Sequence, residues 1–137
     1  MSGTTRKAGS GAETILLVDD DESVRALVYK SLEQEGYTVL EARFNSEALV
    51  IARRHAGLID MMVADVMMPG INGRELAYML ASSRPNMKVL YISGYPIEIV
   101  REKLRKPDLA TFLQKPVAPD VLVRKVREIL QADPPSA

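Results

Sequence analysis

The sequence predicts a doubly wound α/β domain, in which one parallel sheet carries helices on both faces. Short apolar segments alternate with segments of helical pattern, five of each, and this alternation is typical of right-handed strand–helix–strand units. The apolar segments are nearly continuous in hydrophobicity, as expected for parallel strands that are buried on both sides. With 137 residues, the chain has the size of one domain around a single core.

The expected strands are the short apolar runs, each of which has the length of a buried strand. They are Ile15–Val18, Thr38–Leu40, Met61–Ala64, Val89–Ile92 and Thr111–Leu113.

Apolar residues at helical spacing lie between these runs. Three stripes are clear, and they comprise Val24, Leu27, Val28 and Leu32, then Leu76, Met79 and Leu80, then Leu122, Val126, Ile129 and Leu130. The segments Glu47–Arg54 and Ile97–Leu104 show a weaker pattern that is compatible with helices. The expected boundary residues are Asp21 as a cap and Gly36 as the end of the first helix, Asn45 or Ser46 as the second cap, and Pro119 in the last helix's first turn.

The two ends of the chain have a different composition. Residues 1–13 are small and polar and lack a period, so we expect a flexible tail or linker there, and the domain itself at 14–131. Residues 132–137 contain Pro134 and Pro135, which cannot extend a helix, and are expected to form a second tail.

Charge and composition exclude several classes of protein. Lys plus Arg number 18 and Asp plus Glu also number 18, a balance that predicts no direct binding to nucleic acid or to anionic membranes. The absence of cysteine excludes disulfides and thiolate metal sites. No apolar run has the length needed to span a bilayer, so we expect a cytoplasmic protein.

Polar residues follow four of the expected strands. The first strand is followed by Asp19, Asp20 and Asp21, the third by Asp65, the fourth by Ser93 and the fifth by Lys115. In a doubly wound sheet the first strand lies beside the third, with the fourth and fifth further out, so these strand ends meet at one crevice.

The chemistry of such a crevice follows from its charges. Crowded carboxylates repel one another, and a divalent cation such as Mg²⁺, which prefers oxygen ligands, relieves the repulsion. A lysine and a hydroxyl add donors that face an anion. Together these groups support attack by a carboxylate on a phosphoryl group, which gives an acyl phosphate.

Taken singly, each of these residues has a simpler interpretation. Asp21 can merely cap a helix, Asp65 can stand in a turn, Ser93 can be a loop hydroxyl, and Lys115 can be a solvated surface residue. Their joint occurrence at the strand ends favours a functional site.

The segments ILLVDDDESVR, MMVADVMMPGINGREL, VLYISGY and FLQKP resemble the receiver domains of bacterial response regulators, and the resemblance covers residues from about 14 to 131. It implies a flavodoxin-like (βα)5 fold with strand order 2-1-3-4-5. It also implies that Asp65 is the phosphorylation site and that Asp20 and Asp65 bind Mg²⁺ (or Mn²⁺) directly, with the backbone carbonyl of Met67. Asp19 would act in the same pocket through water or directly.

The resemblance further implies a switch. Ser93 would bond a phosphoryl oxygen, Lys115 would pair with Asp65 or its phosphate, and Phe112 would move into the space that Ser93 vacates. Ordinary core packing is the alternative for Phe112. The Lys115–Pro116 bond is a candidate cis peptide.

The same resemblance bears on phosphate lifetime and on partners. Met67 cannot position a hydrolytic water, and Tyr95 can cover the site, so we expect slow self-dephosphorylation. The expected partner is a sensor histidine kinase or a histidine phosphotransfer protein. A homodimer through the fourth helix, fifth strand and fifth helix is possible.

Several classes of parent protein and of related fold are compatible with parts of the sequence. GAETILLVDDD and ISGY look like receivers at the carboxyl end of hybrid sensor histidine kinases, although a stand-alone regulator also fits. A pseudo-receiver interaction module would typically lose an acidic residue or the lysine, and this sequence keeps them. An aspartyl-phosphate hydrolase would usually have a second aspartate where Met67 stands. A flavin-binding electron carrier shares the strand order, but Asp19, Asp20 and Asp21 would repel the flavin phosphate.

Overall fold

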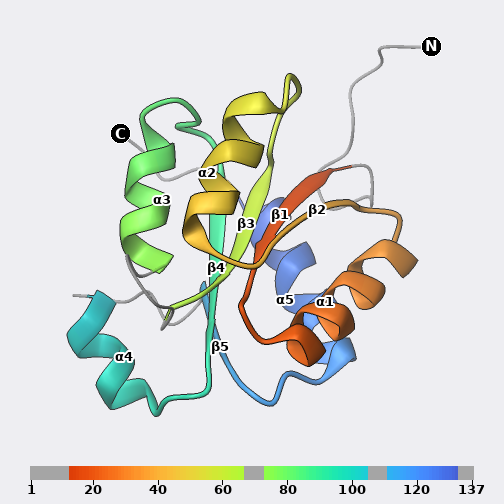
Figure 1. Ribbon diagram of the computed structural model, residues 1–137. Helices are drawn as coiled ribbons and strands as arrows, with labels where there is room; N and C mark the ends of the chain where they lie inside the picture. Colours follow the sequence, from red (N-terminus) through yellow and green to blue (C-terminus); the bar gives the residue numbers. More distant parts are fainter. Residues whose placement is uncertain (1–12, 67–72, 105–110, 133–137) are drawn as a thin grey trace.

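A computed structural model describes residues 13–66, 73–104 and 111–132, which form a five-stranded sheet with helices on both faces (Figure 1). The sheet has the order β2-β1-β3-β4-β5, and all four neighbouring pairs are parallel. The doubly wound fold and its predicted strand order are confirmed. The strands are β1 (Thr14–Val18), β2 (Thr38–Ala42), β3 (Met61–Asp65), β4 (Lys88–Ser93) and β5 (Phe112–Gln114).

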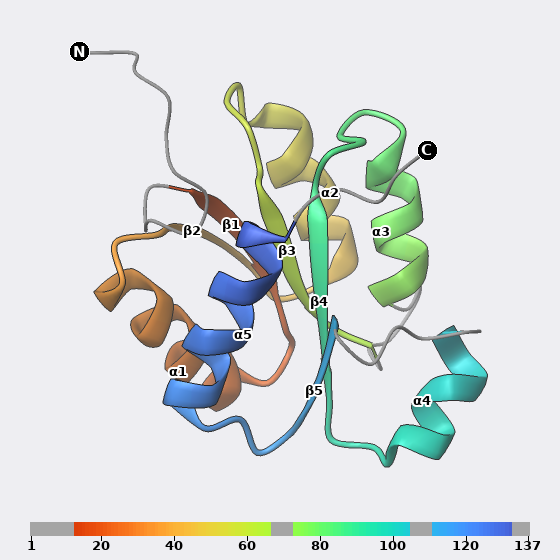
Figure 2. The ribbon, with the colours of Figure 1, turned by 180° about the vertical axis from the view of Figure 1, so that it is seen from behind.

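The helices divide between the two faces of the sheet. Figures 1 and 2 show α1 and α5 on one face and α2 and α3 on the other, while α4 follows β4 at the lower edge of Figure 1. Their bounds are α1 (Glu22–Gln34), α2 (Asn45–Arg54), α3 (Gly73–Ala81), α4 (Ile97–Leu104) and α5 (Pro119–Gln131).

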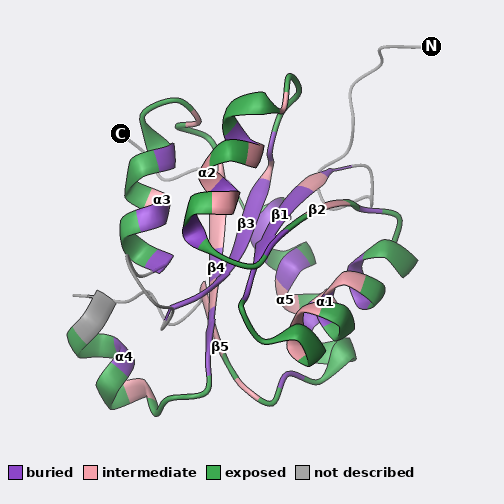
Figure 3. Ribbon diagram, viewed as in Figure 1, coloured by how far each residue is buried: buried purple, intermediate pink, exposed green. Residues whose placement is uncertain are grey.

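Each face of the sheet has its own core. Successive side chains of a strand point to opposite faces, so Ile15 and Leu17 join the core under α1 and α5, while Leu16 and Val18 join the core under α2 and α3. All five residues of β3 are buried, and Figure 3 shows the burial concentrated in the central strands. The edge strand β2 is more exposed, because only one neighbour covers it.

The ends of α1 are as predicted. Asp21 is the N-cap, and its carboxylate accepts hydrogen bonds from the backbone of Ser23 and Val24. Gly36 lies just past the helix with φ 92°, a backbone conformation that favours glycine. Pro119 begins α5, also as predicted.

The predicted cap of α2 was wrong. Phe44 occupies the N-cap position, so Asn45 and Ser46 already belong to the helix. The carboxylate of Glu47 accepts a hydrogen bond from the backbone N–H of Arg43 at 2.8 Å. A side chain from inside the first turn therefore satisfies a backbone donor just before the helix, and α2 begins without a polar cap residue.

Two residues of the predicted apolar stripes point outward instead. Leu27 is 39% exposed and Met79 is 45% exposed, whereas Val28, Leu32, Leu76 and Leu80 are buried. The buried face of α1 includes Ser31, and the buried face of α3 includes Gly73. The buried face of each helix is therefore rotated slightly from the apolar stripe that the sequence predicted. The stripe of α5 is buried throughout, as predicted.

The first described residue, Glu13, already belongs to the folded domain. Glu13 is buried, and its carbonyl accepts a hydrogen bond from the N–H of Thr38, which extends the pairing of β1 with β2 by one residue.

Within the described ranges, no helix combines the length and apolar character that crossing a membrane requires.

Candidate functional site

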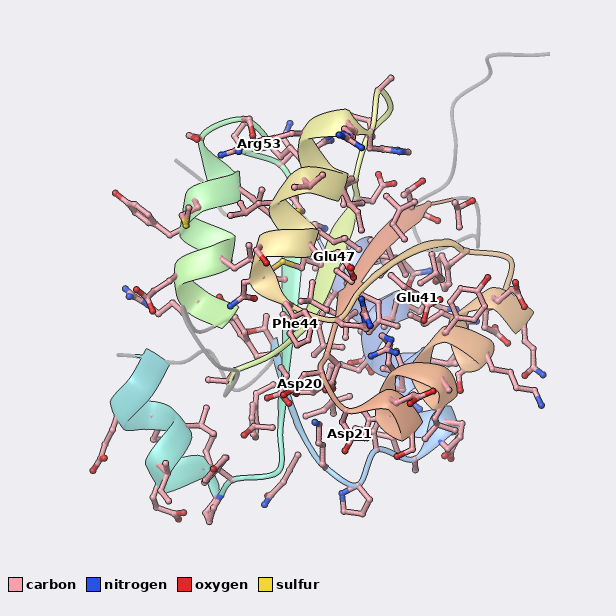
Figure 4. The ribbon with its side chains drawn as sticks, in the orientation of Figure 1. Asp20, Asp21, Glu41, Phe44, Glu47 and Arg53 are labelled. Atoms are coloured by element: carbon pink, nitrogen blue, oxygen red, sulfur yellow. The ribbon has the colours of Figure 1, made fainter. Side chains whose placement is uncertain are left out.

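Three aspartates converge where β1 and β3 end. One carboxylate oxygen from each of Asp19, Asp20 and Asp65 lies within 4.8 Å of the others. Asp19 and Asp65 are buried and Asp20 is exposed. Asp20 lies in the loop after β1, at the lower edge of the sheet, in Figure 4. The predicted convergence of acidic residues at this edge is therefore present.

Lys115 reaches this cluster from the end of β5. Its Nζ donates a hydrogen bond of 2.7 Å to Oδ2 of Asp65 and lies 3.1 Å from Oδ2 of Asp19. The backbone N–H of Lys115 donates to the carbonyl of Ser93 at 2.7 Å, which extends the β4–β5 pairing by one residue. The Lys115–Pro116 peptide bond is cis, the isomer expected for it. The lysine thus bridges two carboxylates from different strands.

Burial and charge shift the pKa values of two of these groups. Burial raises the pKa of the Asp19 carboxyl, against the opposing effects of a backbone hydrogen bond and of the charge on Lys115. Burial also lowers the pKa of the Lys115 ammonium, but its hydrogen bond to Asp65 and the charges of Asp19 and Asp65 outweigh this, so the pKa is raised overall. The lysine therefore stays charged at neutral pH, one cation beside three carboxyl groups.

Asp19 is held on several sides. Its N–H donates to the carbonyl of Ala42 at 3.1 Å, and its Oδ1 accepts a hydrogen bond of 2.9 Å from the N–H of Asp21. Its Oδ2 is buried and close to the Lys115 ammonium, yet this contact lacks hydrogen-bond geometry. A buried carboxylate oxygen with spare acceptor capacity, beside two further carboxylates, fits a hard divalent cation. The acidic cluster can therefore hold a metal ion.

Gly73 permits close packing behind Asp65. Its N–H donates to the carbonyl of Val66 at 3.2 Å, and a Cβ added at this position would lie 2.8 Å from the backbone oxygen of Asp65. On the other side, the N–H of Val66 donates to the carbonyl of Ile92. The backbone at the end of β3 is thus fixed between α3 and β4. Sequence reasoning did not single out Gly73, although it stands in the segment MMVADVMMPGINGREL.

The remaining predicted residues lie around the end of β4. Ser93 is fully buried, and its Oγ accepts a hydrogen bond of 3.0 Å from the N–H of Tyr95, whose side chain is 47% exposed. Phe112 is half-buried and packs with Tyr91 against a small core of Val66 and Val100. Met67 lies outside the described residues.

Comparison with known proteins agrees with this architecture. The family model described as the response regulator receiver domain matches residues 15–127. The sensor kinase CckA of Brucella abortus (strain 2308) is 36% identical over 122 residues, which are 89% of this chain and 13% of the kinase. The chain therefore spans only a small part of that relative.

Two further relatives match over nearly their whole length. The response regulator receiver protein CpdR of the same organism is 30% identical over 118 residues, which cover 86% of this chain and 97% of CpdR. The crystal structure of the receiver domain from hybrid histidine kinase CckA has 37% identity and a TM-score of 0.72, covering 86% of this chain and 99% of that one. With its parallel sheet, its order β2-β1-β3-β4-β5 and its acidic edge, this chain belongs to the response regulator receiver domain family of two-component systems.

Proposed function

We propose that Asp65 accepts a phosphoryl group from a phosphohistidine in a Mg²⁺-dependent transfer and so switches or relays a signal. The observation that carries this proposal is the pairing of Asp65 with Lys115 at 2.7 Å inside a cluster of three carboxylates. In the transfer, a carboxylate oxygen of Asp65 forms a bond to phosphorus. The phosphorus–nitrogen bond breaks, and its electron pair stays on the imidazole of the donor.

The cation is assigned to the acidic cluster. Asp20 and Asp65 would hold the ion directly, with the backbone carbonyl of Met67, and Asp19 would act through water or directly. Mg²⁺, or Mn²⁺ in its place, neutralises negative charge on the phosphoryl oxygens when bound. This assignment rests on the donor set of three carboxylates and on the spare acceptor capacity of Asp19 Oδ2.

Lys115 supplies the second positive charge. Its ammonium already touches Asp65, so it can move from the carboxylate to a phosphoryl oxygen without leaving the site. The raised pKa keeps it protonated over the physiological range, as this role requires. The domain thus assists its own phosphorylation, and we assign it no turnover of a separate substrate.

Ser93 and Phe112 form the proposed switch. An acyl phosphate on Asp65 adds roughly −1.5 to −2 charge, and the Ser93 hydroxyl, one residue beyond the strand partner of Asp65, is drawn to it as a donor. Phe112 then enters the space that Ser93 leaves, away from its packing beside Tyr91. Phenylalanine has no hydroxyl to offer the neighbouring loop, so packing alone would report the switch.

Partners follow from the receiver family and from the relatives. We assign as phosphodonor a sensor histidine kinase or a histidine phosphotransfer protein, in the cytoplasm, and residues 14–131 as the receiver unit. The similarity to the receiver of a hybrid histidine kinase favours a parent protein of that kind. A homodimer through α4, β5 and α5 is part of the same proposal.

Phosphate lifetime is assigned to Met67 and Tyr95. The methionine side chain offers no hydrogen-bonding group that would orient a hydrolytic water, and Tyr95, whose N–H donates to Ser93 Oγ, would limit access to the site. We expect slow self-dephosphorylation. A phosphorylated lifetime of seconds at room temperature would contradict this assignment.

Incubation with Mg²⁺ and acetyl phosphate, followed by intact mass spectrometry, tests the proposal. We expect a mass gain of one phosphoryl group in the natural protein and none in Asp65→Asn. Asp21→Asn is the matched control, because asparagine also caps helices well and the adduct should persist. Failure of the natural protein to gain the group, with no Mg²⁺-dependent binding of beryllium fluoride, would favour a pseudo-receiver module.

A further inference from the structure

Arg25 contacts the backbone of the acidic loop rather than its carboxylates. Its guanidinium donates a hydrogen bond of 2.8 Å to the carbonyl oxygen of Asp19, and its Nε lies 3.6 Å from Oε1 of Glu41. The arginine side chain is only 14% exposed. Glu41, labelled in Figure 4, belongs to β2, next to α1. Arg25 therefore links α1 to the end of β1 and to the edge strand.

This contact completes the set of hydrogen bonds that hold one residue, Asp19. The N–H of Asp19 is bonded to Ala42, its Oδ1 accepts from Asp21, and its carbonyl oxygen accepts from Arg25. The Asp19 carbonyl and the Asp20 N–H belong to the same rigid peptide plane. Fixing that carbonyl thus fixes the direction in which the chain presents Asp20, the exposed member of the acidic cluster.

The backbone of Arg25 contributes to the same loop. Its N–H donates to the carbonyl of Asp21 at 2.9 Å and closes the first turn of α1. The backbone and the side chain of one residue therefore bracket the segment from Asp19 to Asp21. A planar guanidinium can serve the carbonyl and the Glu41 carboxylate at once, which a single ammonium does less well.

We propose that Arg25 is a positioning residue for cation binding, whose guanidinium orients the Asp19–Asp20 peptide so that both carboxylates converge on the ion. This inference rests on the proposed function of the acidic cluster.

The expected sign of the effect distinguishes positioning from electrostatics. A guanidinium close to the cluster repels a divalent cation, so its removal would tighten binding if charge alone mattered. Loss of positioning has the opposite effect and weakens binding. A merely structural role of Arg25 would lower thermal stability and leave the affinity for Mg²⁺ unchanged.

The test is titration of the metal-free protein with Mg²⁺, followed by amide NMR, on the natural protein and on Arg25→Met, which keeps the aliphatic stem. We expect the Kd for Mg²⁺ to rise about 10-fold, the size seen when groups that orient metal ligands are removed. Glu41→Gln leaves in place the hydrogen bond from Arg25 to the Asp19 carbonyl, so it should raise the Kd by less than the roughly 10-fold that marks the removal of an orienting group.

Arg127→Met is the matched control. It removes the same charge and another inter-element ion pair, that between Arg127 and Glu35 at 2.8 Å. Because this pair involves the far end of α1, the Kd for Mg²⁺ should remain that of the natural protein. The melting temperature of each variant in EDTA separates a change of stability from a change of affinity.

Unchanged or tighter Mg²⁺ binding by folded Arg25→Met would overturn the inference and leave the proposed function intact. Absence of Mg²⁺ binding by the natural protein would overturn the proposed function itself. If Arg25→Met does not fold, Arg25→Lys decides, because it keeps the charge but not the planar fork. Weaker binding by Arg25→Lys supports positioning, and an affinity equal to that of the natural protein contradicts it.

Discussion

Positively charged side chains make different contacts at the two ends of the parallel strands. We call the side where the strands begin the amino edge and the side where they end the carboxyl edge. At the amino edge, Arg84 donates hydrogen bonds to the carbonyls of Ala52, His55 and Gly57, and Lys88 donates to those of Ile129, Leu130 and Ala132. Most of these carbonyls lie in the last turns or at the C-caps of α2 and α5, where the helix dipole is negative, and that of Gly57 lies just beyond α2.

At the carboxyl edge, Lys115 instead contacts carboxylates, which outnumber it. At the amino edge, Arg84 and Lys88 donate to carbonyls that the helices leave without intrahelical partners, so these cations bind the fold itself. The carboxyl edge retains an excess of negative charge that the fold does not neutralise. We therefore expect the amino edge to contribute to stability and the carboxyl edge to take part in the proposed phosphoryl transfer.

The largest effect is expected from removing Lys115. Lys115→Met should slow phosphorylation by acetyl phosphate about 100-fold, as when one donor to a transition-state oxygen is lost. Lys88→Met is the same substitution at the amino edge and should leave that rate unchanged. Equal slowing of both variants, measured by intact mass spectrometry, would contradict these different roles of the two lysines.

Arg84→Met tests the structural function of the amino edge. Three hydrogen bonds from a charged donor disappear from the end of α2, and because water replaces them in part, the free energy of unfolding should fall by about 2 kcal/mol. Urea denaturation measures this. Arg53→Met, an exposed arginine in the last turn of the same helix, should change it by less than about 0.5 kcal/mol. A loss of phosphorylation in folded Arg84→Met would contradict the assignment.

Glycine-to-alanine substitutions test how tightly the backbone is packed at the two edges. Gly73→Ala forces a Cβ to within 2.8 Å of the Asp65 backbone oxygen and should cost about 1.5 kcal/mol of stability, in the range of overpacked sites. At the other edge, the Cβ in Gly57→Ala would meet the His55 side chain at 3.2 Å, and this ring can move aside. Guanidinium denaturation should therefore show the smaller loss for Gly57→Ala. Equal losses would show that the approach of α3 to Asp65 is not tight.

The smallest effect concerns Asp21, which is a helix cap within the acidic loop. Hydrogen bonds from Val24 and Ser23 hold its pKa below the ordinary value of 3.8. Its folded pKa is lowered, so its contribution to stability is present above pH 3.8 and is lost as the pH falls through the folded pKa. Asp21→Asn should slightly flatten the acid limb of the stability curve. An unchanged acid limb, measured by urea midpoints, would contradict this role.

The strand ends explain why so much of the site was predictable. The hydrophobic runs mark the strands, and parallel order brings their carboxyl ends together, so the neighbourhood of Asp19, Asp65 and Lys115 follows from the pattern alone. The strand ends differ from the predicted ones by at most two residues. Pairing with a neighbour extends most strands past their apolar runs, whereas β5 begins one residue later than predicted.

Features that depend on three-dimensional approach were not predictable. The contacts of Gly73 with Asp65 and of Arg25 with Asp19 join residues whose spacing carries no period. Leu27 and Met79 lie at the margins of their stripes, where a small rotation of the helix decides burial. The start of α2 was not predicted correctly because a polar residue was expected at its N-cap. Instead, the Glu47 side chain accepts a hydrogen bond from the backbone N–H of Arg43.

The central claim is that Asp65 itself carries the phosphoryl group. Reduction of the phosphorylated protein with borohydride converts an aspartyl phosphate to homoserine, and peptide mass spectrometry then locates that residue. We predict homoserine at position 65, formed only with Mg²⁺ and a phosphodonor present. Homoserine at Asp19, Asp20 or Asp21 instead would contradict the account.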